Sequence, residues 1–179
     1  MPVIAERGYL IPAIGETYVA CAERLRESIL RYHPTVDITI VTESMLPNGN
    51  LGGYANDWQM FKISPYRQTI KLEADMFATS PIDHWWTLFE RRDVVISQGA
   101  RDFYDQHATS RYYRKIFDQN NLPDVYNAIT YWRLSQTAQE FFNTVKSIFT
   151  NWQEYKKLLK LVDGSAFGLK FTKLFERAI

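Results

Sequence analysis

Two carboxylates, Glu73 and Asp75, are the residues in this chain whose type and spacing most directly suggest chemistry. They close a stretch in which apolar and polar residues alternate, which is the pattern of a β-strand. Residues two apart on a strand leave the same face, about 7 Å apart, so both carboxylates could share one ion. Mg²⁺ and Mn²⁺ prefer such oxygen ligands and often hold substrate phosphates as well. The pair predicts a divalent metal site; the alternative is two acids that are simply solvated.

The residues after this pair favour a turn from strand into helix. Ser80, Pro81 and Asp83 form a capping-box-like helix start, with Ser80 as the N-cap and Pro81 as the first helical residue. The predicted helix then carries Trp85 and Trp86. Open α/β sheets bind ligands where strands turn into helices at their carboxyl ends. The acidic pair is therefore expected where such a fold holds its substrate.

Basic residues lie on both sides of this stretch. Lys62 closes a predicted helix and Arg67 follows the next turn, so both cations precede the acidic strand and could meet a pyrophosphate. Ordinary exposed cations are the alternative. Further on, segment 101–115 mixes Arg and Lys with Tyr and Phe, which together can stack on bases or sugars. An ordinary amphipathic loop and helix explains that segment equally well, and both interpretations stay open.

Hydrophobic periodicity predicts strands and helices along the whole chain. The predicted strands cover residues 8–14, 36–42, 69–76, 93–98 and 126–134. The other predicted helices cover residues 17–32, 54–63, a segment capped by Ser135, 151–161 and 163–178. The first strand, helix and strand form a βαβ unit, whose strands run parallel with a right-handed crossover. The predicted fold class is α/β, a mostly parallel twisted sheet with helices on both faces, in a single domain over residues 1–179.

Composition excludes several classes of function. The chain has 179 residues, of which 46% are hydrophobic, so a globular core is expected. A net charge of +1 provides no general attraction to nucleic acid or to an anionic membrane. No apolar run is long enough to span a membrane, and no signal peptide is recognisable. The single Cys21 cannot form an internal disulfide, so we expect a cytoplasmic protein and a structural thiol.

Several motifs, in their order along the chain, resemble nucleotide-sugar glycosyltransferases of the GT-A fold, in particular the glycogenin-like and galactosyltransferase group called family 8. The matching features are an opening strand and helix with Tyr18, Ser28 and Pro34, then Tyr66-Arg67, Glu73-Ala74-Asp75 and Pro81–Trp86, then Tyr112–Lys115 leading to Tyr126-Asn127-Ala128, and finally Asp163-Gly164. The resemblance spans nearly the whole chain. Each motif is short, and it is their common order and spacing that carries the likeness.

The resemblance implies transfer of a hexose from a nucleotide diphosphate sugar, expected to be UDP-linked, to a hydroxyl acceptor, with retention of anomeric configuration. Glu73 and Asp75 would hold Mn²⁺ or Mg²⁺ on the pyrophosphate, and Lys62 and Arg67 would add charge stabilisation. The residues expected to line the nucleotide pocket are Pro12, Ala13, Tyr18 and Thr42. The residues expected to face the sugar and the acceptor are Asp102, Asn127 and Asp163. The acceptor could be a sugar, a protein or a modified nucleic acid.

The chain departs from the family pattern at several positions. Glu73 replaces the first Asp of the acidic motif, Ile129 replaces a Gly, and Gly164 replaces a Gln. No His of the chain occupies the position of the family's C-terminal metal ligand, so water or donor phosphate would complete the site. Two other functions therefore remain open: a catalytically silent nucleotide-sugar-binding module, and a nucleic-acid-binding protein that uses segment 101–115.

Overall fold

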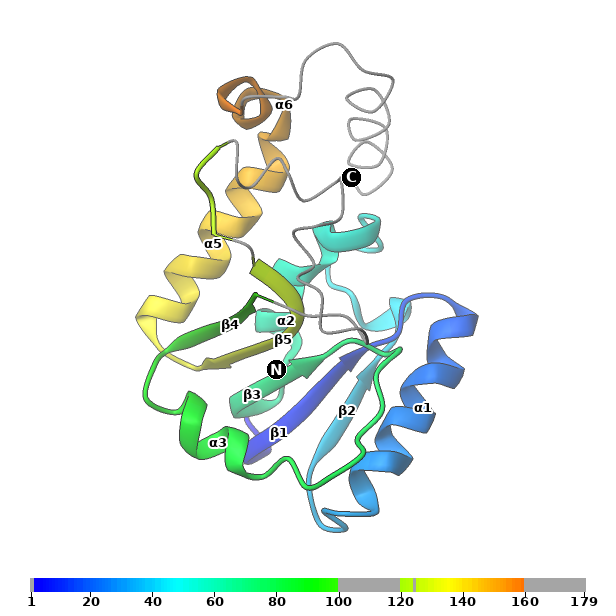
Figure 1. Cartoon of the computed structure of the whole chain (residues 1–179). Helices are drawn as coiled ribbons and strands as arrows, with labels where there is room; N and C mark the ends of the chain where they lie inside the picture. Colours follow the sequence, from blue (N-terminus) through cyan, green and yellow to red (C-terminus); the bar gives the residue numbers. More distant parts are fainter. Residues whose placement is uncertain (1, 100–119, 124, 160–179) are drawn as a thin grey trace.

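A computed structural model describes residues 2–99, 120–123 and 125–159 of the chain. Its described strands form one sheet in the order β2-β1-β3-β5-β4 (Figure 1). The strands are β1 (Ala5–Pro12), β2 (Ile38–Val41), β3 (Tyr66–Leu72), β4 (Val94–Gln98) and β5 (Val125–Arg133). β1 pairs in parallel with β2 and β3, whereas β5 is antiparallel to both β3 and β4. The predicted α/β class is confirmed, and the sheet is mixed, with β5 as its reversed strand.

The helices follow the predicted order with shifted ends. The described α-helices are α1 (Glu16–Leu30), α2 (Asp57–Ile63), α3 (His84–Phe89), α5 (Gln136–Thr150) and α6 (Trp152–Tyr155). Short 3₁₀ turns are η1 (Glu43–Met45), η2 (Gly53–Asn56) and η5 (Lys156–Leu158). The helix start predicted at Ser80 is wrong, because α3 begins only after Asp83, whose side chain makes no capping bond. Ser135 does cap α5, accepting a hydrogen bond from the Ala138 N–H at 3.2 Å. The predicted helix 163–178 lies outside the described residues.

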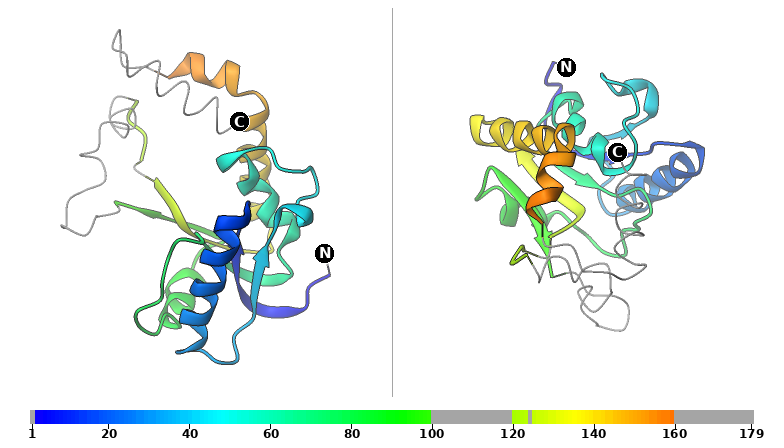
Figure 2. Two further views of the ribbon diagram at one scale, coloured as in Figure 1. Left: turned by 90° about the vertical axis from the view of Figure 1, so that its right-hand side faces the viewer. Right: turned by 90° about the horizontal axis from the view of Figure 1, so that it is seen from above.

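Helices cover both faces of the sheet, as the sequence predicts. On one face, α1 and α3 pack against a core that includes Tyr9, Ile70 and Trp86. On the other face, α2 and α5 pack against a second core that includes Leu10 and Trp132 (Figure 2). Adjacent residues of one strand thus enter different cores, because side chains alternate across a sheet. None of the described helices is long and apolar enough to cross a membrane.

The central strand β3 is buried on both of its faces, which corrects the sequence interpretation. Thr69 and Lys71 were expected on a polar face, yet Thr69 is fully buried and Lys71 is 4% exposed. The reason is that α2 covers the face on which they lie. The strand also ends at Leu72, so Glu73 and Asp75 lie in the turn that follows it rather than on the strand. The expected same-face spacing of the two carboxylates is therefore wrong.

The chain path places a topological switch point between β1 and β3. From β1 the chain passes through α1 to β2 on one side, and then returns through α2 to β3 on the other side of β1. The strand order therefore reverses between β1 and β3. In open α/β sheets, ligands bind at the carboxyl ends of the strands at such a reversal. Glu73 leaves the carboxyl end of β3 at this position.

Candidate functional site

The carboxyl edge of β1 and β2 gathers four of the residues expected to hold a nucleotide. Pro12 ends β1, and the N–H of the buried Ala13 donates to Val41 at 2.8 Å. Thr42 follows β2 directly, and Tyr18 is 52% exposed in the first turn of α1. Because β1, β2 and β3 run parallel, this edge is also the one at which the acidic turn emerges.

The acidic turn is anchored to the sheet at its first residue. The Glu73 N–H donates to the carbonyl of Ala128 at 3.0 Å, and the Met76 N–H donates back to the Glu73 carbonyl at 3.3 Å. Glu73 is half-buried and Asp75 is exposed. Burial raises the pKa of the Glu73 carboxyl; the carboxylates of Asp75 and Asp57 raise it further, while the Lys71 ammonium lowers it. Burial is the largest of these effects, so the raised pKa reflects mainly the partial removal of the Glu73 carboxyl from water.

A buried polar cluster lies beside this turn and joins three elements. The Lys71 Nζ of β3 lies 3.3 Å from Oδ1 of Asp57, the first residue of α2. The side-chain amide of Asn127 on β5 donates to Oδ2 of the same carboxylate. The Thr130 hydroxyl donates to the side-chain Oδ1 of Asn127 at 2.6 Å. With 5% and 22% of their side chains exposed, Lys71 and Asp57 form an ion pair that is largely shielded from water.

The pairing of β5 with β4 is irregular near Asn127. Opposite β4, the pairing passes from Ile96 with Thr130 directly to Ser97 with Tyr126, so residues 127–129 lack partners on β4. Bulges of this kind bend a strand and redirect side chains, and they are frequent beside functional sites. Here the irregularity coincides with Asn127 reaching the face covered by α2, where Asp57 lies.

Side chains near the end of α1 hold the segment that follows the acidic turn. The three bonds run from the Ala78 N–H to Ser28 Oγ at 2.9 Å, from the Tyr32 hydroxyl to the Thr79 carbonyl at 2.8 Å, and from the Ile82 N–H to His33 Nε2 at 3.0 Å. Ser28 is fully buried. Asp75 is therefore bracketed by the β5 contact of Glu73 on one side and by α1 on the other.

The remaining predicted site residues do not join this group. Arg67 is the second residue of β3, six residues or about 20 Å along the chain from Glu73, and pairs with Glu6 at 3.2 Å. Lys62 is exposed on the last turn of α2, with its Nζ 5.4 Å from the Trp58 ring centre. The structure thus brings Asn127 to the acidic turn and leaves both cations elsewhere. The predicted residues Asp102 and Asp163, and segment 101–115, lie outside the described residues.

Sequence reasoning missed Asp57, Lys71 and Thr130. One signal pointed to Lys71: a lysine in the middle of a strand with helices on both faces has no solvent to reach. Buried lysines are found almost only with a partner. Nothing in the local pattern pointed to Asp57 as that partner, because the residues are 14 positions apart and lie on different elements.

The acidic turn fits a divalent ion of a particular kind. Within residues 2–99, 120–123 and 125–159, no three His, Cys, Asp or Glu side chains group closely enough to form a metal cage. Glu73 and Asp75 carry two carboxylates, which are hard oxygen donors, in the turn after β3. Mg²⁺ commonly binds through one or two carboxylates and completes its shell with water and substrate phosphates. The donor set fits an ion shared with a phosphate ligand.

Comparison with models of known protein families finds no match to this chain, and neither does comparison with curated proteins. What the site can do is therefore argued from its own geometry and from the motifs in the sequence.

Proposed function

We propose that this protein transfers a hexose from a nucleotide diphosphate sugar, UDP-linked, to a hydroxyl acceptor in a reaction that needs Mn²⁺ or Mg²⁺. One observation carries the proposal: the acidic turn lies at the strand-order reversal, beside the buried cluster of Asp57, Lys71 and Asn127. The sheet supports a GT-A-like, Rossmann-like arrangement, because parallel strands precede the acidic turn and a reversed strand lies next to it. The motif resemblance supports the same family.

The edge residues would bind the nucleotide. The exposed ring of Tyr18 offers a stacking surface for a base, and stacking of a base on an aromatic ring contributes about 1–3 kcal/mol. Ala13 and Thr42 follow the paired strands β1 and β2 at the same edge of the sheet. The diphosphate would then extend toward Asp75 at the end of β3. A bound divalent ion would offset the charge on the leaving phosphate.

The buried cluster would position the sugar end of the site. Asn127 commits one amide hydrogen to Asp57 and its oxygen to Thr130, which leaves a second amide hydrogen for a ligand hydroxyl. Lys71 is too buried to reach a ligand, so its role is to hold Asp57 charged and in place. Such fixed dipoles and charges stabilise a developing charge without reorganising during the reaction.

The experiment that tests the proposal is a thermal-shift panel of nucleotide sugars with and without Mn²⁺. At about one hundred times the dissociation constant a bound donor adds about 2.7 kcal/mol, or roughly 5–10 °C in a domain of this size. No shift with any donor at millimolar concentration would remove the proposal. A shift without hydrolysis or transfer would instead indicate the silent binding module.

Asp75→Asn, with Glu73→Gln as its matched partner, tests the ion directly. Asp75→Asn keeps the size and removes the charge, so Mn²⁺ affinity in the presence of UDP should collapse while the protein stays folded. Glu73→Gln should weaken Mn²⁺ less, because Glu73 is half-buried and anchored to the sheet. Calorimetric titration measures both effects. Unchanged metal affinity in Asp75→Asn would show that the acidic turn is only a solvated loop.

A further inference from the structure

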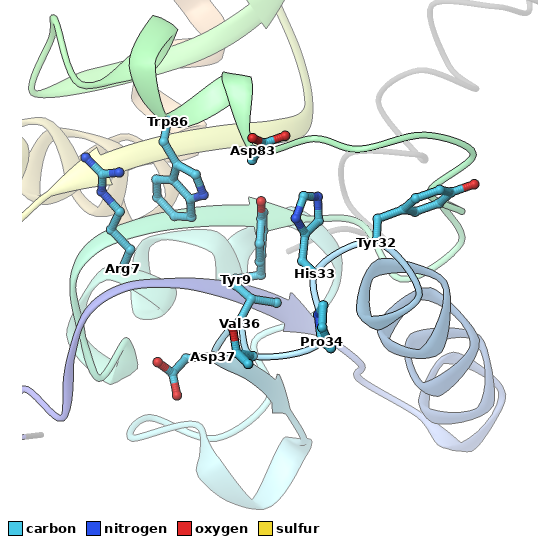
Figure 3. A pocket seen from close by; sticks show the side chains of 10 residues that line it. Arg7, Tyr9, Tyr32, His33, Pro34, Val36, Asp37, Asp83 and Trp86 are labelled. Carbon is cyan, nitrogen blue, oxygen red and sulfur yellow. The ribbon is translucent and has the colours of Figure 1, made fainter.

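A pocket of about 500 Å³ lies toward the amino end of β1, away from the acidic turn. Its walls come from β1, from the connection between α1 and β2, and from the turn into α3 (Figure 3). The lining residues used below are Arg7, Tyr9, Tyr32, His33, Asp37, Asp83 and Trp86. None of them is assigned to the proposed nucleotide site, whose nearest residue on β1, Pro12, is about 10 Å along the strand from Tyr9.

The floor of the pocket rests on a buried aromatic pair, Tyr9 and Trp86, which are 1% and 7% exposed. The rings of Tyr9 and Trp86 lie 5.3 Å apart, and the Trp86 indole hydrogen-bonds to the Tyr9 hydroxyl. Burial raises the pKa of Tyr9 to about 12, so this hydroxyl stays protonated. The Arg7 guanidinium lies 5.6 Å from the Trp86 ring centre and pairs with Glu90 at 2.6 Å. A rigid floor with a held cation at its edge lowers the entropy lost when a ligand binds.

The rim offers free acceptors beside an oriented donor. Asp37 and Asp83 are exposed, and within the described part of the chain neither carboxylate makes a side-chain hydrogen bond or an ion pair. His33 Nε2 accepts from the Ile82 N–H, so the neutral ring carries its proton on Nδ1 and can donate it. In Figure 3, Asp83 and His33 lie on the same side of the pocket as the Tyr9 hydroxyl. Tyr32, 42% exposed, forms an outer aromatic wall.

This combination selects one class of ligand. An anion would meet two carboxylates and a single arginine that is already paired. A cation would be attracted by the two carboxylates, but the Trp86 ring that could stack on it is already covered by Arg7. An apolar ligand would cover the polar rim without satisfying it, which costs free energy. A saccharide has hydroxyls that both donate and accept, and C–H surfaces that can pack on the exposed ring of Tyr32.

We propose that this pocket binds a neutral saccharide, with Asp83 as the principal hydroxyl acceptor. Saccharide binding at this pocket does not depend on the proposed transferase function. Its role does rest on that function: the pocket would hold a distant unit of a saccharide acceptor. An oligosaccharide rather than a single sugar would be needed to reach from this pocket to the acidic turn.

The test is calorimetric titration of the full chain with maltotriose, xylotriose and chitotriose, without nucleotide or metal. Wild type should bind one of them, and Asp83→Ala should bind it at least tenfold more weakly, as expected on losing a charged hydrogen-bond acceptor. Glu23→Ala, an exposed change on α1 outside the pocket, should bind like wild type. Thermal unfolding should show all variants equally folded, since Asp83 is exposed.

Three results would overturn the proposal: no binding of any of these sugars at millimolar concentration, equal binding by Asp83→Ala, or loss of binding in Asp75→Asn alone, which would place the sugar at the acidic turn. The donor thermal shift is measured separately on the same variants and should be unchanged in Asp83→Ala. Failure of the donor shift with intact saccharide binding would remove the transferase proposal and leave the pocket in place.

Discussion

Breaking the ion pair between Lys71 and Asp57 should destabilise the protein. Replacing Asp57 should cost more stability than replacing Lys71. Asp57→Asn leaves a lysine with 5% exposure and no ion-pair partner in the described structure, whereas Lys71→Met leaves a carboxylate with 22% exposure and its Asn127 hydrogen bond. Removing one partner of a buried pair costs about 3–5 kcal/mol. Because water reaches part of Asp57, we expect about 3 kcal/mol for Asp57→Asn and about 2 kcal/mol for Lys71→Met.

The double variant Asp57→Asn/Lys71→Met should be much less destabilised than the sum of the two single variants. Neither charge is then left alone, and replacing a buried ion pair by neutral groups is often close to neutral in stability. In a domain of this size each 1 kcal/mol shifts Tm by about 2–4 °C, so Asp57→Asn should lose roughly 6–12 °C.

Urea unfolding at pH 7 measures the double-mutant cycle, with midpoint and slope compared among the variants. The matched control is the pair of Arg26 and Glu23 on α1, whose charged atoms are 3.2 Å apart but whose side chains are nearly half exposed. Neutralising either residue of this exposed pair should lower the free energy of unfolding by less than about 1 kcal/mol. Additive losses in the Asp57 and Lys71 cycle, or a cost no greater than that of the control pair, would refute the reasoning.

Three further outcomes are expected. Gly8→Ala should cost about 1–3 kcal/mol in urea unfolding, because its Cβ would lie 2.4 Å from the Tyr66 ring; an unchanged midpoint would contradict the packing described. Ser28→Ala should cost about 1–3 kcal/mol by leaving the Ala78 N–H without a partner, and it should also weaken Mn²⁺ binding through the turn it holds, whereas an effect on stability alone would separate α1 from the acidic turn. Since the pKa of Glu73 is raised above 4.5, Mn²⁺ affinity should increase as pH rises through that raised pKa. The free energy of unfolding should decrease over the same interval, because the folded state binds the proton more tightly. Both trends should flatten in Glu73→Gln, and a pH dependence identical to wild type would assign them to another group.

The local sequence determined most of the elements. The helical spacing of Ala22, Leu25 and Ile29 predicts α1, and all three are buried in the core. β-branched residues predict β2, and Ser135 marks the start of α5. The βαβ rule then predicts the parallel pairing of the first strands, which the register confirms. These predictions succeed because periodicity reports which side of a segment avoids water, and that is a property of neighbouring residues.

The position of the acidic pair was also predictable to within a few residues. Both residues were expected near the carboxyl end of a central strand, and both lie there. Where the strand ends was not predictable, because the alternation of Ile70, Leu72 and Ala74 continues beyond Leu72. The Glu73 N–H still bonds to β5, but the turn closed by Met76 takes the chain away from the sheet.

Only the tertiary structure decided which residues surround the acidic pair. β5 enters the sheet reversed between β3 and β4, and this order brings Asn127 to Asp57 across 70 residues of sequence. Lys71 alternates like a solvated residue and becomes buried because α2 packs over it. Strand order and helix placement depend on the packing of distant segments, about which a local pattern carries no information. The sequence therefore shows which residues could carry chemistry, whereas the assembly of the sheet determines which residues lie beside them.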